Sequence, residues 1–443
     1  GAKWQPATLL RQRPDGRFTA IPVPAFAVDS LHEDVDAAFA DVDRDGDPDL
    51  VVASGGNEFF DDAPALRPRL YLNDGRGGFA RRDDLLPAGL HENWGTVAVG
   101  DLDGDGAPDL FLGGRVVSRR YGATPRSVLL RNDGRGRFAD VTGAVAPALA
   151  RAGMVAEARF VDVDADGRQD LVVAGEWMPV RLFRNDGRRL VEATGAAGFT
   201  GTEGWWQSVT VADVDGNGAP DLVLGNLGTN AWLRASARAP VRLYLADFGG
   251  TGTERAVLTH VREGREVPAH GRDDFVRLIP ALRSRYPSYA SFGASTLADL
   301  FGAEAVRAAT VREARTFASM LALNDGRGRF TLRPLPPAAQ VAPVYAALAA
   351  DLVGDPLPDL WLAGNQSAVP PLFGRHDAGW GTLLRATGGG AFSVLEPGDG
   401  APALAGDVRA LHPLRHASGR RTVVVARSGA PLQILHWTTP PAR

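Results

Sequence analysis

The chain has 443 residues, a formal net charge of −4 and no cysteine. Without cysteine, disulfides, thiol catalysis and cysteine-bound zinc are excluded. The slight acidic excess argues against nucleic acid as a partner, because phosphate binding needs a basic surface. No run of about 20 apolar residues occurs, so we expect no membrane span. The chain opens at Gly1 without a methionine and shows no signal peptide, so we expect a processed chain or part of a longer one.

The first predicted element is a hairpin at residues 7–18, ATLLRQRPDGRF. From residue 39 a longer acidic unit recurs, and a fixed recurring unit indicates a repeat architecture. The four complete copies are FADVDRDGDPDLVVASGG (39–56), VGDLDGDGAPDLFLGGR (99–115), FVDVDADGRQDLVVAGEW (160–177) and VADVDGNGAPDLVLGN (211–226). The weaker copies are LADFGGTGTERAVLT (245–259), AADLVGDPLPDLWLAGN (349–365) and GDVRALHPLRHASGRRTVVVARS (406–428), the last of which has lost its loop.

A second element follows many of these copies. It reads LYLNDGRGGF (70–79), LLRNDGRGRF (129–138), LFRNDGRRL (182–190), LALNDGRGRF (321–330) and LLRATGGGAF (383–392). An Asn-Asp-Gly centre between apolar runs predicts a hairpin. Two strands around an acidic loop plus a hairpin give four strands in about 60 residues, which is the size of a propeller blade.

Seven such units predict an all-β, seven-bladed β-propeller as a single domain over residues 1–443. The end, PLQILHW (431–437), stops partway through a blade. We therefore expect the N-terminal strand to complete the last blade and to leave no open sheet edge.

Residues 270–316 interrupt the pattern. Phe275, Leu278 and Leu282 have helical spacing behind a possible cap at Asp273, and a second short helix is predicted around Leu297. We expect a helical insertion on one face of the propeller, because so short a segment could hardly bury a core of its own.

The four complete acidic loops share the form D-x-D-x-[DN]-G-x-x-D. Calcium takes six to eight oxygen ligands, and glycine at position 6 permits the sharp turn that the loop needs. The predicted ligands are Asp41, Asp43, Asp45, Asp49 and the carbonyl of Asp47 in loop one; Asp101, Asp103, Asp105, Asp109 and the carbonyl of Ala107 in loop two; Asp162, Asp164, Asp166, Asp170 and the carbonyl of Arg168 in loop three; and Asp213, Asp215, Asn217, Asp221 and the carbonyl of Ala219 in loop four.

These loops are not EF-hands, because position 12 is apolar and the flanks are rich in β-formers. The alternative is a set of polar turns without metal, but clustered carboxylates repel one another without a cation. We therefore expect about four structural calcium ions, whose binding energy adds to folding. Loop five, with Asp247 but Arg255 at position 9, is expected to be empty. Loop six, with Asp351, Asp355 and Asp359, is a weak candidate for a further site.

The acidic loops resemble those of FG-GAP/VCBS repeat proteins, the family that includes the integrin α-subunit propeller. The segments GWWQSVTVADVDGNGAPDLVLGNLGTN (204–230) and HGRDDFVRLIPALRSRYPSYASFGASTLADLF (270–301) are similar to those of bacterial surface proteins related to cartilage acidic protein. The resemblance implies the propeller fold, calcium and export. It implies almost nothing about activity.

A ligand is expected on the face opposite the acidic loops, at the residues before the first strand and after the second strand of each blade. Tryptophan, amide and charged side chains there suit a carbohydrate or a protein partner. The candidates are Glu33, Asn57, Glu92, Trp94, Arg115, Glu176, Trp177, Trp205, Trp206, Asn230, Arg272, Asp273, Tyr345 and Asn365. The alternatives are that each tryptophan packs in the core and that Asp273 caps a helix.

Three functions remain. The preferred one is a non-catalytic module on the bacterial surface that binds a glycan or protein, with export inferred from sites that fill at extracellular calcium levels. The second is a structural subunit of a larger surface assembly, which a broad apolar patch would favour. The third is a polysaccharide-active hydrolase or lyase, which paired acids in a central channel would favour, although no nucleophile, zinc or phosphate-loop motif is present.

Overall fold

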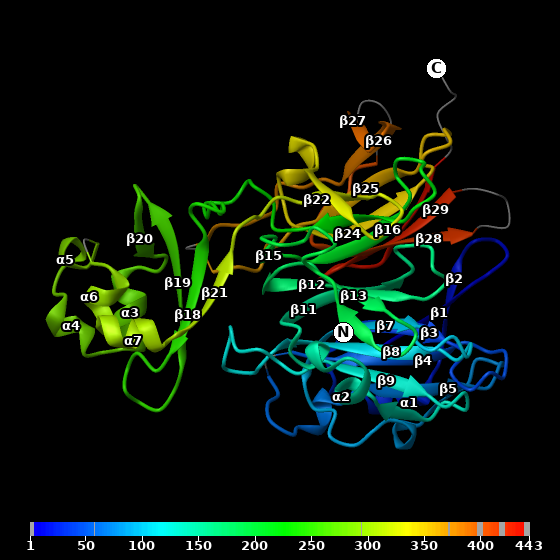
Figure 1. The fold of residues 1–443 in the computed structure, drawn as a ribbon. Coiled ribbons are helices and arrows are strands. Elements are labelled where there is room, and N and C mark those ends of the chain that lie inside the picture. Colours follow the sequence, from blue (N-terminus) through cyan, green and yellow to red (C-terminus); the bar gives the residue numbers. More distant parts are fainter. Residues whose placement is uncertain are drawn as a thin grey trace.

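The computed structural model describes residues 4–56, 58–293, 295–370, 373–396, 402–415 and 421–437. Six antiparallel sheets form a body, and a smaller lobe projects from one side of it (Figure 1). No helix in the described ranges is long and apolar enough to cross a membrane.

The body is built from sheets one to six in chain order. They are β3 (Asp34–Ala40), β4 (Asp49–Ser54), β5 (Arg69–Asn73) and β6 (Phe79–Arg81); β7 (Asn93–Gly100), β8 (Asp109–Val116), β9 (Val128–Asn132) and β10 (Phe138–Asp140); β11 (Met154–Val161), β12 (Asp170–Met178), β13 (Arg181–Asn185) and β14 (Leu190–Glu192); β16 (Ser208–Ala212), β17 (Asp221–Gly225), β22 (Met320–Asn324) and β23 (Phe330–Pro334); β24 (Val344–Ala350), β25 (Asp359–Gly364), β26 (Thr382–Gly388) and β27 (Ala391–Leu395); and β28 (Val408–Arg415), β29 (Arg421–Arg427) and β30 (Gln433–Trp437).

Short elements join these strands. β15 (Gly204–Trp205) pairs with β12, and β1 (Leu9–Gln12) pairs with β2 (Phe18–Ile21). The helices of the body are α1 (Pro24–Val28) and α2 (Thr142–Val145), with 3-10 turns at Pro64–Leu66, Asp83–Leu85, Pro147–Arg151 and Pro337–Gln340. The prediction of an all-β protein built mostly from four-stranded antiparallel sheets is confirmed.

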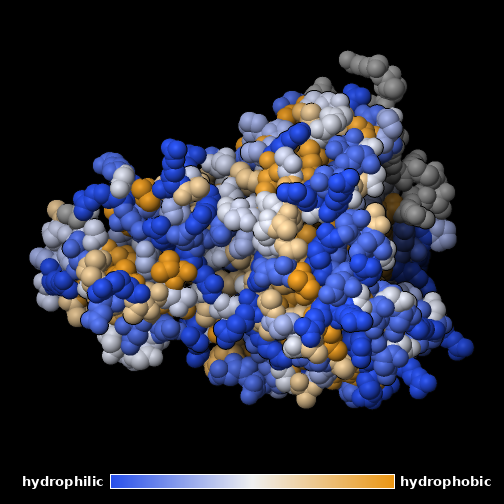
Figure 2. Space-filling model, viewed as in Figure 1, coloured by the Kyte–Doolittle hydropathy of each residue, from blue (hydrophilic) through white to orange (hydrophobic). Residues whose placement is uncertain are grey.

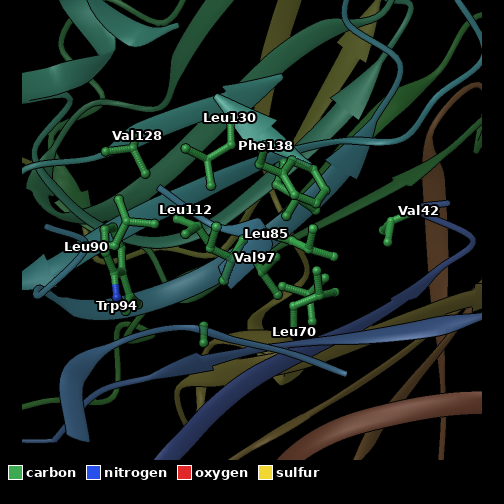
Figure 3. Packing of buried hydrophobic residues seen from close by; sticks show 14 residues of the cluster. Val42, Leu70, Leu85, Leu90, Trp94, Val97, Leu112, Val128, Leu130 and Phe138 are labelled. Atoms are coloured by element: carbon green, nitrogen blue, oxygen red, sulfur yellow. The ribbon is translucent and has the colours of Figure 1, made fainter. Parts of the chain in front are cut away.

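Consecutive sheets pack face to face through buried apolar clusters. Between sheets one and two, Val51 belongs to the same buried cluster as Leu70, Val97 and Leu112, and Figure 3 shows the last three of these side chains packed together. Similar clusters lie at each of the next four interfaces. The second strands of sheets two to five have a neighbouring sheet on both faces. The second face of β4 packs instead against Val23 and Phe26, which explains why β4 is buried at all six positions and why its sequence is a continuous apolar run.

The first strands of the six sheets surround a common axis. Residues of β3, β7, β11, β16, β24 and β28 line one cavity of about 550 Å³. We call these the inner strands. Sheets packed radially around a central channel define a β-propeller. The acidic loops follow the inner strands, so they lie at one end of the channel.

The blade count differs from the seven predicted. In the described residues six sheets surround the channel, because the unit at 245–259 belongs to the projecting lobe. The N-terminal hairpin β1–β2 does not pair with β28, β29 or β30 in these residues, so the predicted closing blade is not formed there. On the side of β3 that faces away from sheet two, Val35 is 49% exposed and Phe39 is 55% exposed.

The lobe spans residues 241–314 and is inserted between β17 and β22 of sheet four. It contains a sheet of β18 (Val241–Ala246), β19 (Arg255–Arg262), β20 (Arg265–Pro268) and β21 (Thr310–Ala314), and the helices α3 (Arg272–Leu278), α4 (Leu282–Arg285), α5 (Tyr289–Gly293), α6 (Leu297–Phe301) and α7 (Ala303–Ala308). The insertion is thus larger than the predicted 270–316, and its last residues form a strand.

The lobe has its own apolar core, in which Phe275, Leu282 and Leu300 pack against Val257 of the lobe sheet. Helix α3 begins at Arg272 with Gly271 as its N-cap, so Asp273 does not cap it. Thr296 and Asp299 form a capping box at α6, which satisfies free backbone N–H groups at the start of that helix.

Candidate metal centre and ligand-binding funnel

Each complete acidic loop brings three carboxylates together. Their oxygen atoms lie within 4.8 Å of one another in groups of Asp41, Asp43 and Asp45; Asp101, Asp103 and Asp109; Asp162, Asp164 and Asp170; and Asp213, Asp215 and Asp221. The described residues of loops five and six form no such group. Four compact sets of carboxylate oxygens are the donor chemistry that calcium prefers.

The other predicted ligands have partners inside the loops. Asp105 Oδ1 accepts a hydrogen bond from the Ala107 amide at 2.6 Å, and Asp166 Oδ1 accepts one from the Arg168 amide at 2.9 Å. Asn217 Oδ1 accepts the Ala219 amide at 2.7 Å. These contacts form the tight turn that brings positions 1 and 3 together.

The aspartate at position 9 has a backbone role that the loop pattern did not reveal. Asp109 Oδ2 accepts the Leu102 amide at 2.8 Å, and its Oδ1 accepts the Asn132 amide at 2.7 Å. Equivalent pairs of bonds are made by Asp49, Asp170 and Asp221. Each of these buried carboxylates therefore ties its loop to the third strand of the same sheet.

Three asparagines of the hairpin repeat join neighbouring sheets. Asn132 Nδ2 donates to the Val42 carbonyl, Asn185 Nδ2 to the Leu102 carbonyl, and Asn324 Nδ2 to the Val163 carbonyl, each at 2.8 Å. We call them the inter-sheet asparagines. The sequence pattern predicted the Asn-Asp-Gly centre only as the turn of a hairpin. Its recurrence in the third strand of sheets one to four was the signal for this second role.

The loops are electrostatically incomplete without a cation. Asp43 Oδ1 and Asp164 Oδ1 are buried and have no hydrogen-bond partner. Burial, followed by repulsion from Asp45, raises the pKa of Asp43. In loop three Arg184 contacts Asp164 and Asp170 and supplies part of the missing charge. Unpartnered, mutually repelling carboxylate oxygens fit a divalent cation.

Loops five and six show which parts of the pattern remain when the three-carboxylate group is lost. In loop six Asp359 keeps the position 9 bonds, accepting the Leu352 amide at 2.9 Å and the Ala386 amide at 3.0 Å. In loop five Asp247 accepts the Thr251 and Gly252 amides of its own turn. The aspartate at position 9 thus persists in loop six, where the metal pattern is lost, but not in loop five, where position 9 is Arg255.

The channel widens at the end opposite the acidic loops. A funnel of about 1050 Å³ opens there, lined by the first residues of the inner strands and by the turn after β29. Three predicted ligand-face residues line it, namely Trp94, Arg115 and Tyr345. Gln207 and Arg409, which were not among the candidates, also line it. The Arg409 guanidinium lies 4.2 Å from the centre of the Tyr345 ring.

Ion pairs organise the funnel wall. Arg115 donates to Glu176 Oε1 at 2.6 Å, and Tyr121 donates its hydroxyl to Glu176 Oε2 at 2.6 Å. Trp177 Nε1 in turn donates to the Tyr121 oxygen at 2.9 Å. Gln207 Nε2 also donates to Glu176 Oε1 at 3.4 Å, so Glu176 accepts from three neighbouring groups and holds Arg115 at the wall.

Two carboxyl groups meet at the neck of the funnel. Thr96 Oγ1 lies 3.0 Å from Asp36 Oδ2 and 3.3 Å from Glu157 Oε1. A threonine hydroxyl carries one hydrogen, so both contacts are satisfied only when one carboxyl group is protonated. Burial raises the pKa of Asp36 and raises the pKa of Glu157 to about 7. Burial therefore favours the protonated form of these carboxyl groups, and the Arg159 guanidinium, 3.0 Å from Glu157 Oε1, opposes this effect.

Several predicted ligand-face residues, including Trp94 at the border of the funnel, serve packing. Trp94 is 1% exposed, lies in the cluster of Figure 3, and donates Nε1 to the Leu66 carbonyl at 3.0 Å. Trp206 is fully buried and donates to the Thr202 carbonyl. Asn365 is buried and donates to the Gly379 and Gly406 carbonyls. The prediction that Trp94 and Trp206 are exposed on the ligand face is therefore wrong, because these side chains fill the spaces between sheets.

The remaining candidates are scattered. Glu33 and Glu92 do not line the funnel, Asn230 donates to the Val341 carbonyl, and Asn57 is outside the described residues. Arg272 and Asp273 lie on α3 of the lobe. Trp205 stacks edge-on with Trp177 and lines a separate, largely apolar pocket of about 170 Å³ with Trp232 and Phe373.

Comparisons with known proteins agree with the repeat pattern. A model described as FG-GAP-like repeat matches residues 41–112 and 162–224. The chain therefore carries FG-GAP-like repeats, and its sheets form a β-propeller. A search of curated proteins gives no match.

Several solved structures are similar at low identity. The structure of BBS1N in complex with ARL6DN has a TM-score of 0.36 and 12% identity, covering 93% of this chain and 94% of that one. The V. cholerae biofilm matrix protein Bap1 has a TM-score of 0.33 and 10% identity, over 96% and 88%. The Dos1 propeller has a TM-score of 0.39 and 8% identity, over 96% and 80%.

Proposed function

We propose that this protein is a calcium-binding, non-catalytic propeller of the bacterial cell surface that binds a glycan or protein ligand in the funnel. The observation that carries the proposal is the division of the channel: acidic loops crowd one end, and a polar funnel opens at the other. The funnel is of the size that ligand sites occupy. Arg115, Gln207 and Arg409 offer donors around the exposed edge of Tyr345, which suits a hydroxyl-rich ligand.

Calcium supports this function by fixing the blades. The residues that would hold it are those of the four carboxylate groups, with the carbonyls of Asp47, Ala107, Arg168 and Ala219 as further donors. When bound, the ion would neutralise the carboxylates and so stabilise the loops that fix the inner strands. Sites of this kind fill readily at millimolar calcium, so we place the protein outside the cell.

The test is a glycan-array measurement on the calcium-loaded protein, followed by titration of the best ligand. Replacing Tyr345 by alanine and Arg409 by glutamine should each weaken binding about tenfold or more, because they remove a contact surface and a charged donor from the wall. The matched control is Arg188→Gln, an exposed arginine of the β13–β14 hairpin. Unchanged affinity in both funnel variants would place the ligand elsewhere.

A second candidate function is hydrolysis of a polysaccharide, and the Asp36–Thr96–Glu157 arrangement favours it. Glycoside hydrolysis uses one protonated and one ionised carboxyl group on either side of the scissile bond, and here two carboxyl groups with raised pKa values meet at one hydroxyl in the channel. Release of reducing sugar from a bound polysaccharide that disappears in Glu157→Gln, with binding kept, would establish the enzyme. Binding without any product in the wild-type protein would exclude it for that ligand.

The structural-subunit alternative has less support. Figure 2 shows apolar residues in small separate spots on the viewed face, with no broad patch of the kind that an assembly interface presents.

A further inference from the structure

A cavity of about 260 Å³ lies where the lobe meets the body. The body contributes Arg151 and the connection between β8 and β9, which is drawn in cyan and reaches toward the lobe in Figure 1. The lobe contributes residues of β18 and β21 and the loop between β18 and β19. The polar lining consists of Arg120, Thr124, Arg151, Glu254, Thr310 and Arg312.

The charges around this cavity do not balance. Arg120 donates Nε to Glu254 at 2.7 Å, and a second nitrogen contacts the same carboxylate. The single acid is therefore already paired. Neither Arg151 nor Arg312 forms an ion pair with a described residue. Two guanidinium charges face the cavity without a counter-ion.

Arg312 is the more constrained of the two. It is half-buried, donates Nε to the Gly122 carbonyl at 3.0 Å, and contacts the Thr124 hydroxyl. Both partners are neutral. Burial, unopposed by any carboxylate, lowers the pKa of Arg312, whereas Arg81, Arg82 and Arg242, which are paired with acids, shift upward. Desolvating a cation without a counter-ion is costly.

A purely structural role would explain the contacts of Arg312 but not the presence of Arg151 in the same cavity. The two bonds of Arg312 attach the 122–124 segment to the lobe, and neutral donors would serve that purpose as well. They do not account for Arg151, which comes from a different segment of the body and lines the same cavity. Guanidinium groups present a planar fork of donors that matches carboxylate, sulfate and phosphate oxygens.

We propose that this cavity binds an oxyanion between Arg151 and Arg312 and that the bound anion joins the lobe to the body. The site is separate from the funnel and does not depend on the ligand proposed there. Its volume is several times the roughly 30 Å³ that one water takes up in the liquid, so it admits an anionic group together with part of the molecule that carries it.

The test is calorimetric titration of the full chain, calcium-loaded, with sodium sulfate at constant ionic strength, with chloride as the reference anion. We expect saturable binding of sulfate. Arg151→Gln and Arg312→Gln should each weaken it about tenfold or more, because each removes a charged donor. Glu254→Gln should tighten it several-fold, because it removes the one negative charge and frees Arg120. Arg188→Gln controls for net charge.

Folding is checked by circular dichroism, and Arg312→Lys keeps the charge if Arg312→Gln does not fold. Glucose 6-sulfate, glucose 6-phosphate and glucuronate then distinguish the source of the anion, since the tightest of the three identifies the group. The proposal is wrong if sulfate and all three sugars fail to saturate. It is equally wrong if Arg188→Gln weakens binding as much as Arg151→Gln does.

Discussion

Acidic side chains are arranged differently at the two ends of the inner strands. At the loop end, four groups of aspartates converge, and Asp43 and Asp164 keep buried oxygens without any hydrogen-bond partner. At the funnel end, Glu176 is paired with Arg115, and Asp36 and Glu157 meet at one hydroxyl. At the first end the acids are grouped with one another, whereas at the second end arginine side chains pair with Glu176 and Glu157.

We infer from this difference that the loop end serves stability and that the funnel end serves ligand recognition. A carboxylate group that is complete only with metal makes the fold depend on an ion from the surroundings. A funnel whose charges are already balanced can present donors and acceptors to a ligand without a large electrostatic penalty. The experiments below should therefore affect one end and spare the other.

Removing calcium should have the largest effect. Ligand at a thousand times its Kd stabilises by about 4 kcal/mol per site, so excess chelator should lower the Tm by on the order of 10 °C or more. Differential scanning calorimetry with and without chelator, together with elemental analysis, measures this. About four ions per chain are expected. An unchanged Tm and no bound calcium would show that the loops are turns without metal.

Asp109→Ala and Asp359→Ala should sharpen the distinction between metal and backbone roles. Asp109→Ala leaves two backbone N–H groups without their acceptor and Asp359→Ala leaves three, each substitution at a cost of about 2–4 kcal/mol. Only Asp109→Ala should also lose a calcium ion. Urea unfolding with and without chelator tests this: chelator should narrow the gap between Asp109→Ala and the wild-type protein and leave the cost of Asp359→Ala unchanged.

Asn132→Ala tests the contact between sheets one and two. It removes a buried amide that donates to the Val42 and Pro108 carbonyls and should cost about 2 kcal/mol. Asn73→Ala is the matched control, because the Asn73 side-chain amide donates to the Pro48 carbonyl of its own sheet. Equal losses in the two variants would contradict a special role for the inter-sheet asparagines.

The funnel end should respond to pH. The pKa of Glu157 is raised to about 7 in the folded protein from 4.5, so the folded state binds more protons than the unfolded state between these values. Stability from this group is therefore present at low pH and is lost as pH rises through about 7. Glu157→Gln should remove this dependence and be more stable than wild type at pH 8 by about 2 kcal/mol. Urea midpoints from pH 5 to 8 measure it, and parallel profiles for the two proteins would contradict a raised pKa of Glu157.

The smallest effect is expected at the uncovered face of β3. Phe39 is 55% exposed, so Phe39→Ser should change the free energy of unfolding by about 0.5 kcal/mol or less. Phe111→Ala, in the buried second strand of the next sheet, should cost about 3–5 kcal/mol. A large loss in Phe39→Ser would show that the side chain is covered in solution, by a closing blade or by another copy of the chain.

Local sequence determined much of this protein. Strand pairs, hairpins and the three-carboxylate groups follow from short-range rules, since apolar alternation, Asn-Asp-Gly turns and D-x-D spacing act within about ten residues. The carboxylates of positions 1 and 3 converge because the loop itself turns. The FG-GAP-like repeats were recognisable for the same reason.

Contacts between distant segments were decided by the tertiary structure. Residues 245–259 look like a ring unit in sequence, but β18 and β19 pair with β20 and β21 in the lobe instead. Trp94 and Trp206 lie at the predicted positions along the chain, yet packing between sheets turns their rings into the core. The funnel wall, the Asp36–Glu157 pair and the arginines of the lobe cavity come from segments far apart in the sequence. Spacing along the chain does not predict these contacts, because they depend on how whole sheets pack against one another.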